Sequence, residues 1–65
     1  MDSKIKRYSL SEVISYIEYK MRNGTDTYDE EILYQEFHTY GNVSKKKHRE
    51  TLKELIREMR EEYGF

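Results

Sequence analysis

The sequence predicts an all-α fold, a small three-helix bundle built as a single domain over residues 1–65. Three observations lead to this prediction. The chain has 65 residues, which is enough for one hydrophobic core only. Apolar residues recur at spacings of three and four, the period of an amphipathic helix, in three successive segments. Each segment follows a Ser or Thr suited to capping a helix, and none alternates polar and apolar residues as a strand does.

The first predicted helix covers residues 10–22. Ser9 and Glu12 form a capping box, in which the Ser9 hydroxyl accepts from a backbone amide and Glu12 reaches back to the amide of Ser9. Asn23 and Gly24 tolerate the left-handed conformation and end the helix. Its apolar side, which we expect to be buried, consists of Leu10, Val13, Ile14, Ile17 and Met21.

The second predicted helix covers residues 28–39. Thr27 and Glu30 form another capping box, and the acidic residues in the first turn suit the positive end of the helix dipole. Gly41 and Asn42 end the helix. Its expected buried side consists of Ile32, Leu33, Phe37 and Tyr40.

The third predicted helix starts after Ser44 and covers residues 45–62. The connection before it spans only Tyr40 to Val43, and a connection this short brings neighbouring helices into contact. We expect the first helix to pack across the other two and residues 1–7 to be flexible. The apolar row of the third helix consists of Leu52, Leu55, Ile56, Met59 and Tyr63.

Composition argues against an enzyme, a metal site and a cofactor. The chain has no cysteine, and His38 and His48 are too far apart in sequence for a zinc motif. We expect His48 to be a partly buried core residue. Caps account for Ser and Thr, no Gly-rich phosphate loop is present, and no catalytic constellation emerges. With no apolar run of membrane-spanning length and no signal-peptide pattern, we expect a cytoplasmic protein without a membrane partner.

Charge is nearly balanced overall but unevenly distributed. The chain has 12 basic and 13 acidic residues, yet residues 43–65 hold seven of the basic and only five of the acidic ones. Lys45, Lys46, Lys47 and Arg49 fall in the first turns of the third predicted helix, where each cation costs about 0.3–1 kcal/mol against the helix dipole. This cost suggests an anionic partner.

The third predicted helix also separates its charges. Helical winding places a basic arc beside the apolar row and an acidic arc apart from it. The alternative is a solvated face in which Glu50 pairs with Lys53 and Glu54 with Arg57. The basic arc consists of Lys46, Arg49, Lys53, Arg57 and Arg60, and the acidic arc of Glu50, Glu54, Glu58 and Glu62.

Residues 32–55, ILYQEFHTYGNVSKKKHRETLKEL, resemble the helix-turn-helix half of winged-helix DNA-binding proteins. The shared features are a short helix, a Gly-containing turn and a Ser-started recognition helix that ends in Leu-x-x-Leu. Lys47 and His48 stand where the family usually has Thr and an aliphatic residue, and Phe37 where it needs a small one. Because the chain ends at Phe65, such a domain would lack the full wing. The resemblance implies contacts with phosphates or bases from Ser44, Lys45, Lys46, Lys47 and Arg49.

Two binding functions follow from these patterns. The first is a small DNA-binding or nucleoprotein module, in transcriptional regulation or in plasmid or viral replication, that uses the third helix with Lys53 and Arg57 as further contacts. The second is a protein-interaction module, as a homodimer or an adaptor docked on a larger enzyme. In that case we expect an exposed aromatic patch that includes Tyr16 and Tyr19.

Overall fold

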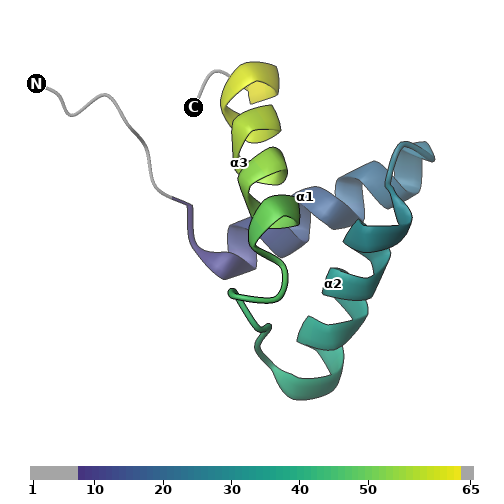
Figure 1. Ribbon diagram of the computed structural model, residues 1–65. Coiled ribbons are helices and arrows are strands. Elements are labelled where there is room, and N and C mark those ends of the chain that lie inside the picture. Colours follow the sequence, from purple (N-terminus) through teal and green to yellow (C-terminus); the bar gives the residue numbers. More distant parts are fainter. Residues whose placement is uncertain (1–7, 64–65) are drawn as a thin grey trace, which may run out of the picture.

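A computed structural model describes residues 8–63, apart from the side chain of Tyr63, and over this range it consists of three helices and no strand. These are α1 (Leu10–Asn23), α2 (Tyr28–Tyr40) and α3 (Arg49–Tyr63). α1 contacts both of the other helices, and Figure 1 shows α2 and α3 diverging from it. The predicted all-α three-helix bundle is therefore confirmed. The flexibility predicted for residues 1–7 and the burial predicted for Tyr63 lie outside the described residues.

Local signals in the sequence determine where α1 and α2 begin and end. The Ser9 hydroxyl accepts from the Glu12 N–H at 3.2 Å, and the Glu12 carboxylate accepts from the Ser9 N–H at 2.8 Å. Thr27 and Glu30 form the same reciprocal pair before α2, at 3.2 and 3.0 Å. Gly24 and Gly41 follow the two helices with φ of 70° and 76°, in the left-handed region that glycine adopts at least cost. Both predicted capping boxes are confirmed.

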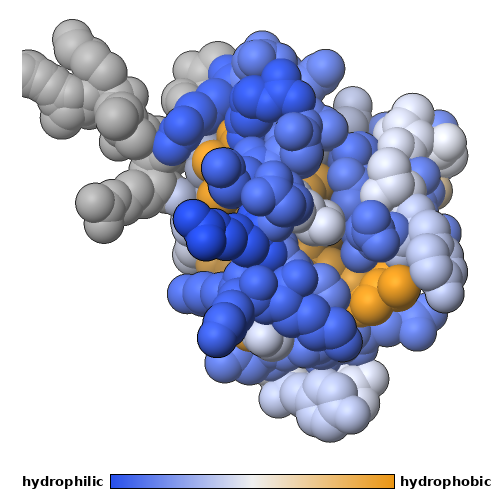
Figure 2. All heavy atoms as spheres, viewed as in Figure 1, coloured by the Kyte–Doolittle hydropathy of each residue, from blue (hydrophilic) through white to orange (hydrophobic). Residues whose placement is uncertain are grey.

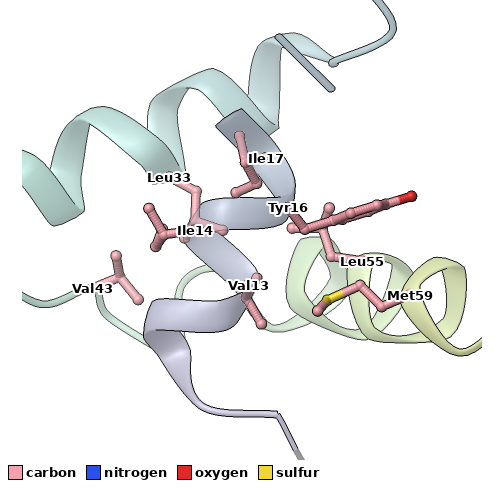
Figure 3. Close-up of a cluster of buried hydrophobic side chains, with 8 residues drawn as sticks. All are labelled: Val13, Ile14, Tyr16, Ile17, Leu33, Val43, Leu55 and Met59. Carbon is pink, nitrogen blue, oxygen red and sulfur yellow. The ribbon is translucent and has the colours of Figure 1, made fainter. Parts of the chain in front are cut away.

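The hydrophobic core lies where α1 crosses the other two helices (Figure 3). Ile17 of α1, Leu33 of α2 and Leu55 of α3 are completely buried at its centre. Two residues predicted to be buried are exposed, Met21 by 38% and Tyr40 by 78%. Lys20 takes the inward position in the last turn of α1, and Tyr40 is the last residue of α2. The core consists of Val13, Ile14, Tyr16, Ile17, Leu33, Val43, Leu55 and Met59.

The connection between α2 and α3 differs from the prediction. It runs from Gly41 to His48, because α3 begins at Arg49 instead of residue 45. Ser44 starts a single turn in which the His48 N–H donates to the Ser44 carbonyl at 3.0 Å. The Lys47 N–H donates to the Ser44 hydroxyl at 3.3 Å. The connection is thus longer than the three or four residues typical of a helix-turn-helix, and the lysines precede α3.

Within residues 8–63, no helix is both long enough and apolar enough to cross a lipid bilayer.

Candidate nucleic-acid interface

Five predicted contact residues lie together around the start of α3. Lys45, Lys46 and Lys47 occupy the turn before the helix, whereas Arg49 and Lys53 lie four residues apart on it and share a face. All five side chains are exposed. Figure 2 shows a strongly hydrophilic surface over α3 on the face turned to the viewer. We call these five residues the basic surface.

The cations of the basic surface have no ion-pair partner among the residues that the structure describes. The expected pairing of Glu50 with Lys53 is therefore absent there. Lys47 is only close enough to Glu36 for its charge to help lower the pKa of that carboxyl group. The basic surface thus carries positive charge that few nearby carboxylates compensate.

Arg57, a further predicted contact, belongs to a different environment. Its guanidinium group pairs with the Glu54 carboxylate, as predicted, and lies 3.7 Å from an oxygen of Glu61. The hydrogen bond that Arg57 donates to Glu54, followed by the attraction of the two carboxylates, raises the pKa of Arg57. These pairs remove Arg57 from the set of uncompensated cations, so we leave it out of the basic surface.

Glu58 was predicted to belong to an exposed acidic arc, but it takes part in an ion cluster that joins all three helices. Its Oε1 accepts from Lys20 Nζ at 2.8 Å and from the Tyr16 hydroxyl at 3.2 Å. Lys20 also donates to Glu30 Oε2 at 2.8 Å. Lys20 and Glu30 are only 7% and 3% exposed. We call Lys20, Glu30 and Glu58 the buried triad.

The pKa of Lys20 reflects this environment. Burial acts to lower it, but the hydrogen bonds to Glu30 and Glu58 and the attraction of both carboxylates outweigh burial, and the pKa is raised. The structural role of Lys20 was not predicted from the sequence. The signal was its position three residues after Ile17, on the apolar side of α1.

Glu36 of α2 holds the turn that presents the lysines. Its Oε1 lies 2.6 Å from His48 Nε2, and its Oε2 accepts from the Ser44 N–H at 3.2 Å. The His48 hydrogen bond is the main cause that lowers the pKa of Glu36. His48 is buried, as predicted. Ser44, a predicted contact, shapes the turn through its amide and its hydroxyl group.

The predicted exposed aromatic patch is present only in part within residues 8–62, since Tyr19 is 52% exposed but Tyr16 is not. Tyr16 is buried, and Tyr19 stacks on it with the ring centroids 6.2 Å apart. Tyr28 and Tyr40, exposed by 77% and 78%, lie at opposite ends of α2. The prediction is therefore wrong for Tyr16, because this ring faces the core and its hydroxyl group reaches Glu58.

A hollow of about 330 Å³ lies between the start of α2 and α3. The carboxylates that line this hollow repel phosphate. On α3, an anion is therefore attracted only to the side that carries the basic surface. No group of three His, Cys, Asp or Glu side chains within the described part of the chain is placed to hold a metal ion. The hollow is lined by Thr27, Asp29, Glu30, Glu50, Thr51, Glu54 and Glu58.

A family model described as "YonP prophage protein" matches residues 9–60. The chain belongs to this family. Comparison with curated proteins and with solved structures finds no match. The match to the YonP family runs from the first capping residue nearly to the end of α3, so both the buried triad and the basic surface lie within it.

One pair of carboxyl groups in this YonP-family domain is unfavourable at neutral pH. A hydrogen bond with Asp26, followed by the charge of Asp26, raises the pKa of Glu31 above its ordinary 4.5. Because the pKa of this acid is higher in the folded protein, the free energy of unfolding falls as the pH rises through the pKa of Glu31. Glu31→Gln is therefore expected to raise the melting temperature at pH 7 and to have less effect below pH 4.5. An equal or lower melting temperature at pH 7 would argue against this pair.

Proposed function

We propose that this YonP-family domain binds DNA through the basic surface, as a nucleoprotein module in transcriptional regulation or in plasmid or viral replication. One observation carries the proposal: five exposed cations without an ion-pair partner among residues 8–63 gather around the start of α3. Each can neutralise one phosphate and release the counterion bound there. The family description, a prophage protein, fits the viral setting.

The charges around the basic surface support the same function. Glu36, Glu54 and Glu58 are occupied by partners within the domain, which reduces their competition with phosphate for these cations. The lysine ammonium group acts on phosphate as a point charge, whereas the planar guanidinium group of arginine is shaped for paired hydrogen bonds to a base edge. We therefore infer that residues 44–48, which we call the lysine turn, contact the DNA backbone. Arg49 is the residue best suited to a base contact in a groove.

Helix-turn-helix docking is the finer form of this proposal. In that arrangement the start of α3 faces the major groove, with Ser44, Lys45, Lys46, Lys47 and Arg49 nearest to the DNA. The connection of eight residues, Gly41–His48, would place the lysine turn against the phosphates beside the groove.

The salt dependence of DNA binding tests the proposal. Each neutralised phosphate contributes about −0.9 to the slope of log affinity against log salt, so four contacts give about −3.6. Lys46→Ala combined with Arg49→Ala is expected to flatten this slope by about 0.9 if Arg49 contacts a base and by about 1.8 if it contacts a phosphate, without unfolding the domain. The measurement is a duplex titration between about 50 and 200 mM salt.

The matched control for this experiment removes the same charge elsewhere. Arg22→Ala combined with Arg57→Ala deletes two arginines that pair with Glu18, Glu54 and Glu61. This variant is expected to keep the wild-type slope. If wild type binds no DNA at about 50 mM salt, or if the Lys46 and Arg49 double variant binds as tightly as wild type, the basic surface is a solvated face.

The alternative function is protein interaction, as a homodimer or as an adaptor on a larger enzyme. The observation in its favour is the exposure of Tyr28 and Tyr40, since tyrosine is enriched in protein interfaces. Sedimentation distinguishes the two proposals. The alternative would be supported by a protein that does not bind DNA and whose dimer dissociates when Tyr28 or Tyr40 is replaced by Ser.

A further inference from the structure

The carboxylate of Glu36 joins α2 to both ends of the lysine turn. Ser44 and His48 are the first and last residues of this turn, and the His48 N–H donates to the Ser44 carbonyl. One oxygen of Glu36 contacts His48 Nε2, and the other accepts from the Ser44 N–H. The three lysines stand between these two anchor points. A single side chain therefore closes the turn against α2.

Glu36 carries a negative charge, which by itself repels the anions that the basic surface would bind. The groups that favour its ionised form are His48, the Ser44 N–H and Lys47, and together they outweigh burial and lower its pKa. Glu36 is thus a carboxylate at neutral pH, and it lies close enough to Lys47 to offset part of the positive charge. By charge alone, Glu36 weakens the binding of phosphate. Any favourable contribution of Glu36 must therefore come from geometry.

We propose that Glu36 is a positioning residue, which holds Lys45, Lys46 and Lys47 in a turn already shaped to meet DNA phosphates. This inference rests on the proposed DNA-binding function. The buried side chain of Val43 and the hydrogen bond from the His48 N–H to the Ser44 carbonyl order part of this connection, and the Glu36 carboxylate ties both ends of the turn to α2. Without Glu36 the turn would have to be fixed against α2 during binding, and such ordering lowers affinity. Because the turn is already closed in the free protein, the free-energy cost of ordering it belongs to folding and does not lower the affinity for DNA.

Glu36→Gln tests the inference because charge and geometry predict opposite results. Glutamine has the same size but offers one oxygen and one amide group, so when its oxygen accepts from the Ser44 N–H it can hold His48 only by donating to Nε2, and the hydrogen bond that His48 donates to the carboxylate is lost. Loss of the anchor is expected to weaken duplex DNA binding about three- to tenfold, although the substitution removes a negative charge. Hydrogen exchange at the Ser44 amide is expected to become faster.

The matched control is Glu50→Gln. Glu50 is an exposed carboxylate beside Arg49, and it has no hydrogen bond or ion pair within residues 8–63. This substitution changes the net charge equally near the basic surface, and it is expected to leave affinity unchanged or slightly higher. Glu36→Asp keeps the charge but shortens the reach by one methylene group, and weaker binding by this variant as well supports the positioning role.

Circular dichroism establishes that each variant keeps its helices before DNA binding is compared. Binding by Glu36→Gln that equals or exceeds wild type, in parallel with Glu50→Gln, would overturn the positioning role and leave the proposed function intact. Absence of binding by wild type itself would instead remove the proposed function. An unchanged Ser44 amide exchange rate in Glu36→Gln would also overturn the inference, because the turn would then be closed without the carboxylate.

Discussion

Replacing Leu55 by Ala is expected to lower the free energy of unfolding by about 2–5 kcal/mol. Leu55 is completely buried and brings α3 into the core formed with Ile17 and Leu33. Truncation removes its transfer free energy and leaves a cavity that rigid neighbouring helices fill only in part. A domain of 65 residues has a total stability of about 3–10 kcal/mol, so this loss is a large fraction of the total.

Urea unfolding followed by circular dichroism measures this loss. Leu52→Ala is the matched control, since Leu52 lies one turn earlier on α3 and is only partly buried. It removes the same atoms and is expected to cost less. Equal losses for the two variants, or a loss below about 1 kcal/mol for Leu55→Ala, would show that α3 does not pack as described.

Replacing Lys20 by Met is expected to cost about 3–5 kcal/mol of unfolding free energy. Methionine keeps most of the length of the side chain, one heavy atom less than lysine, but it leaves the carboxylate of Glu30, only 3% exposed, without its cation. Glu58 is about one third exposed and can recover water, so the loss comes mainly from Glu30. Breaking a buried pair costs more than the pair contributes, because one charge is left desolvated.

A second substitution shows whether the uncompensated charge is the cause. Lys20→Met combined with Glu30→Gln is expected to recover most of the stability, since glutamine also suits the capping box with Thr27. Arg22→Met, which breaks the exposed pair with Glu18, is the surface control and is expected to cost at most about 1 kcal/mol. A double variant no more stable than Lys20→Met would contradict this explanation.

The pH dependence of this effect has a definite sign. The pKa of Lys20 is raised in the folded protein, so its pairing contributes fully from neutral pH up to the ordinary value of 10.5. The contribution is lost only as pH rises through the still higher folded value. The difference in stability between wild type and Lys20→Met is therefore expected to stay constant from pH 7 to 9 and to shrink in strong alkali.

Signals close together in the sequence predicted most of the fold. Ser9 and Thr27 with their partners three residues later, and the glycines at 24 and 41, act within one helical turn. They therefore predict helix ends without knowledge of the rest of the chain. Ser44 carries the same kind of local signal, and it does start a turn, but α3 begins only at Arg49. Glu36, eight residues before Ser44, contacts both ends of that turn, and no local signal around Ser44 predicts these contacts.

Long-range contacts decided which charged side chains belong to the candidate site. The sequence shows a basic run before and within α3, and the structure shows that Lys45, Lys46, Lys47, Arg49 and Lys53 are exposed. Arg57 follows the same helical spacing, yet the carboxylates on both sides of it compensate its charge. Glu58 follows the spacing of the acidic arc, but it bonds to Lys20, which is 38 residues away.

The sequence by itself determined the helical class, two pairs of helix ends, most of the core and the position of the basic run. Capping and helical periodicity are short-range effects, and the hydrophobic pattern directs each helix face toward the core. Only the tertiary structure decided that Lys20 is buried, that Tyr40 and Met21 are exposed, and that Glu36 holds the lysine turn. Whether a charged side chain is compensated depends on the residues that packing brings within a few ångströms of it. The spacing of residues along one helix does not specify these neighbours.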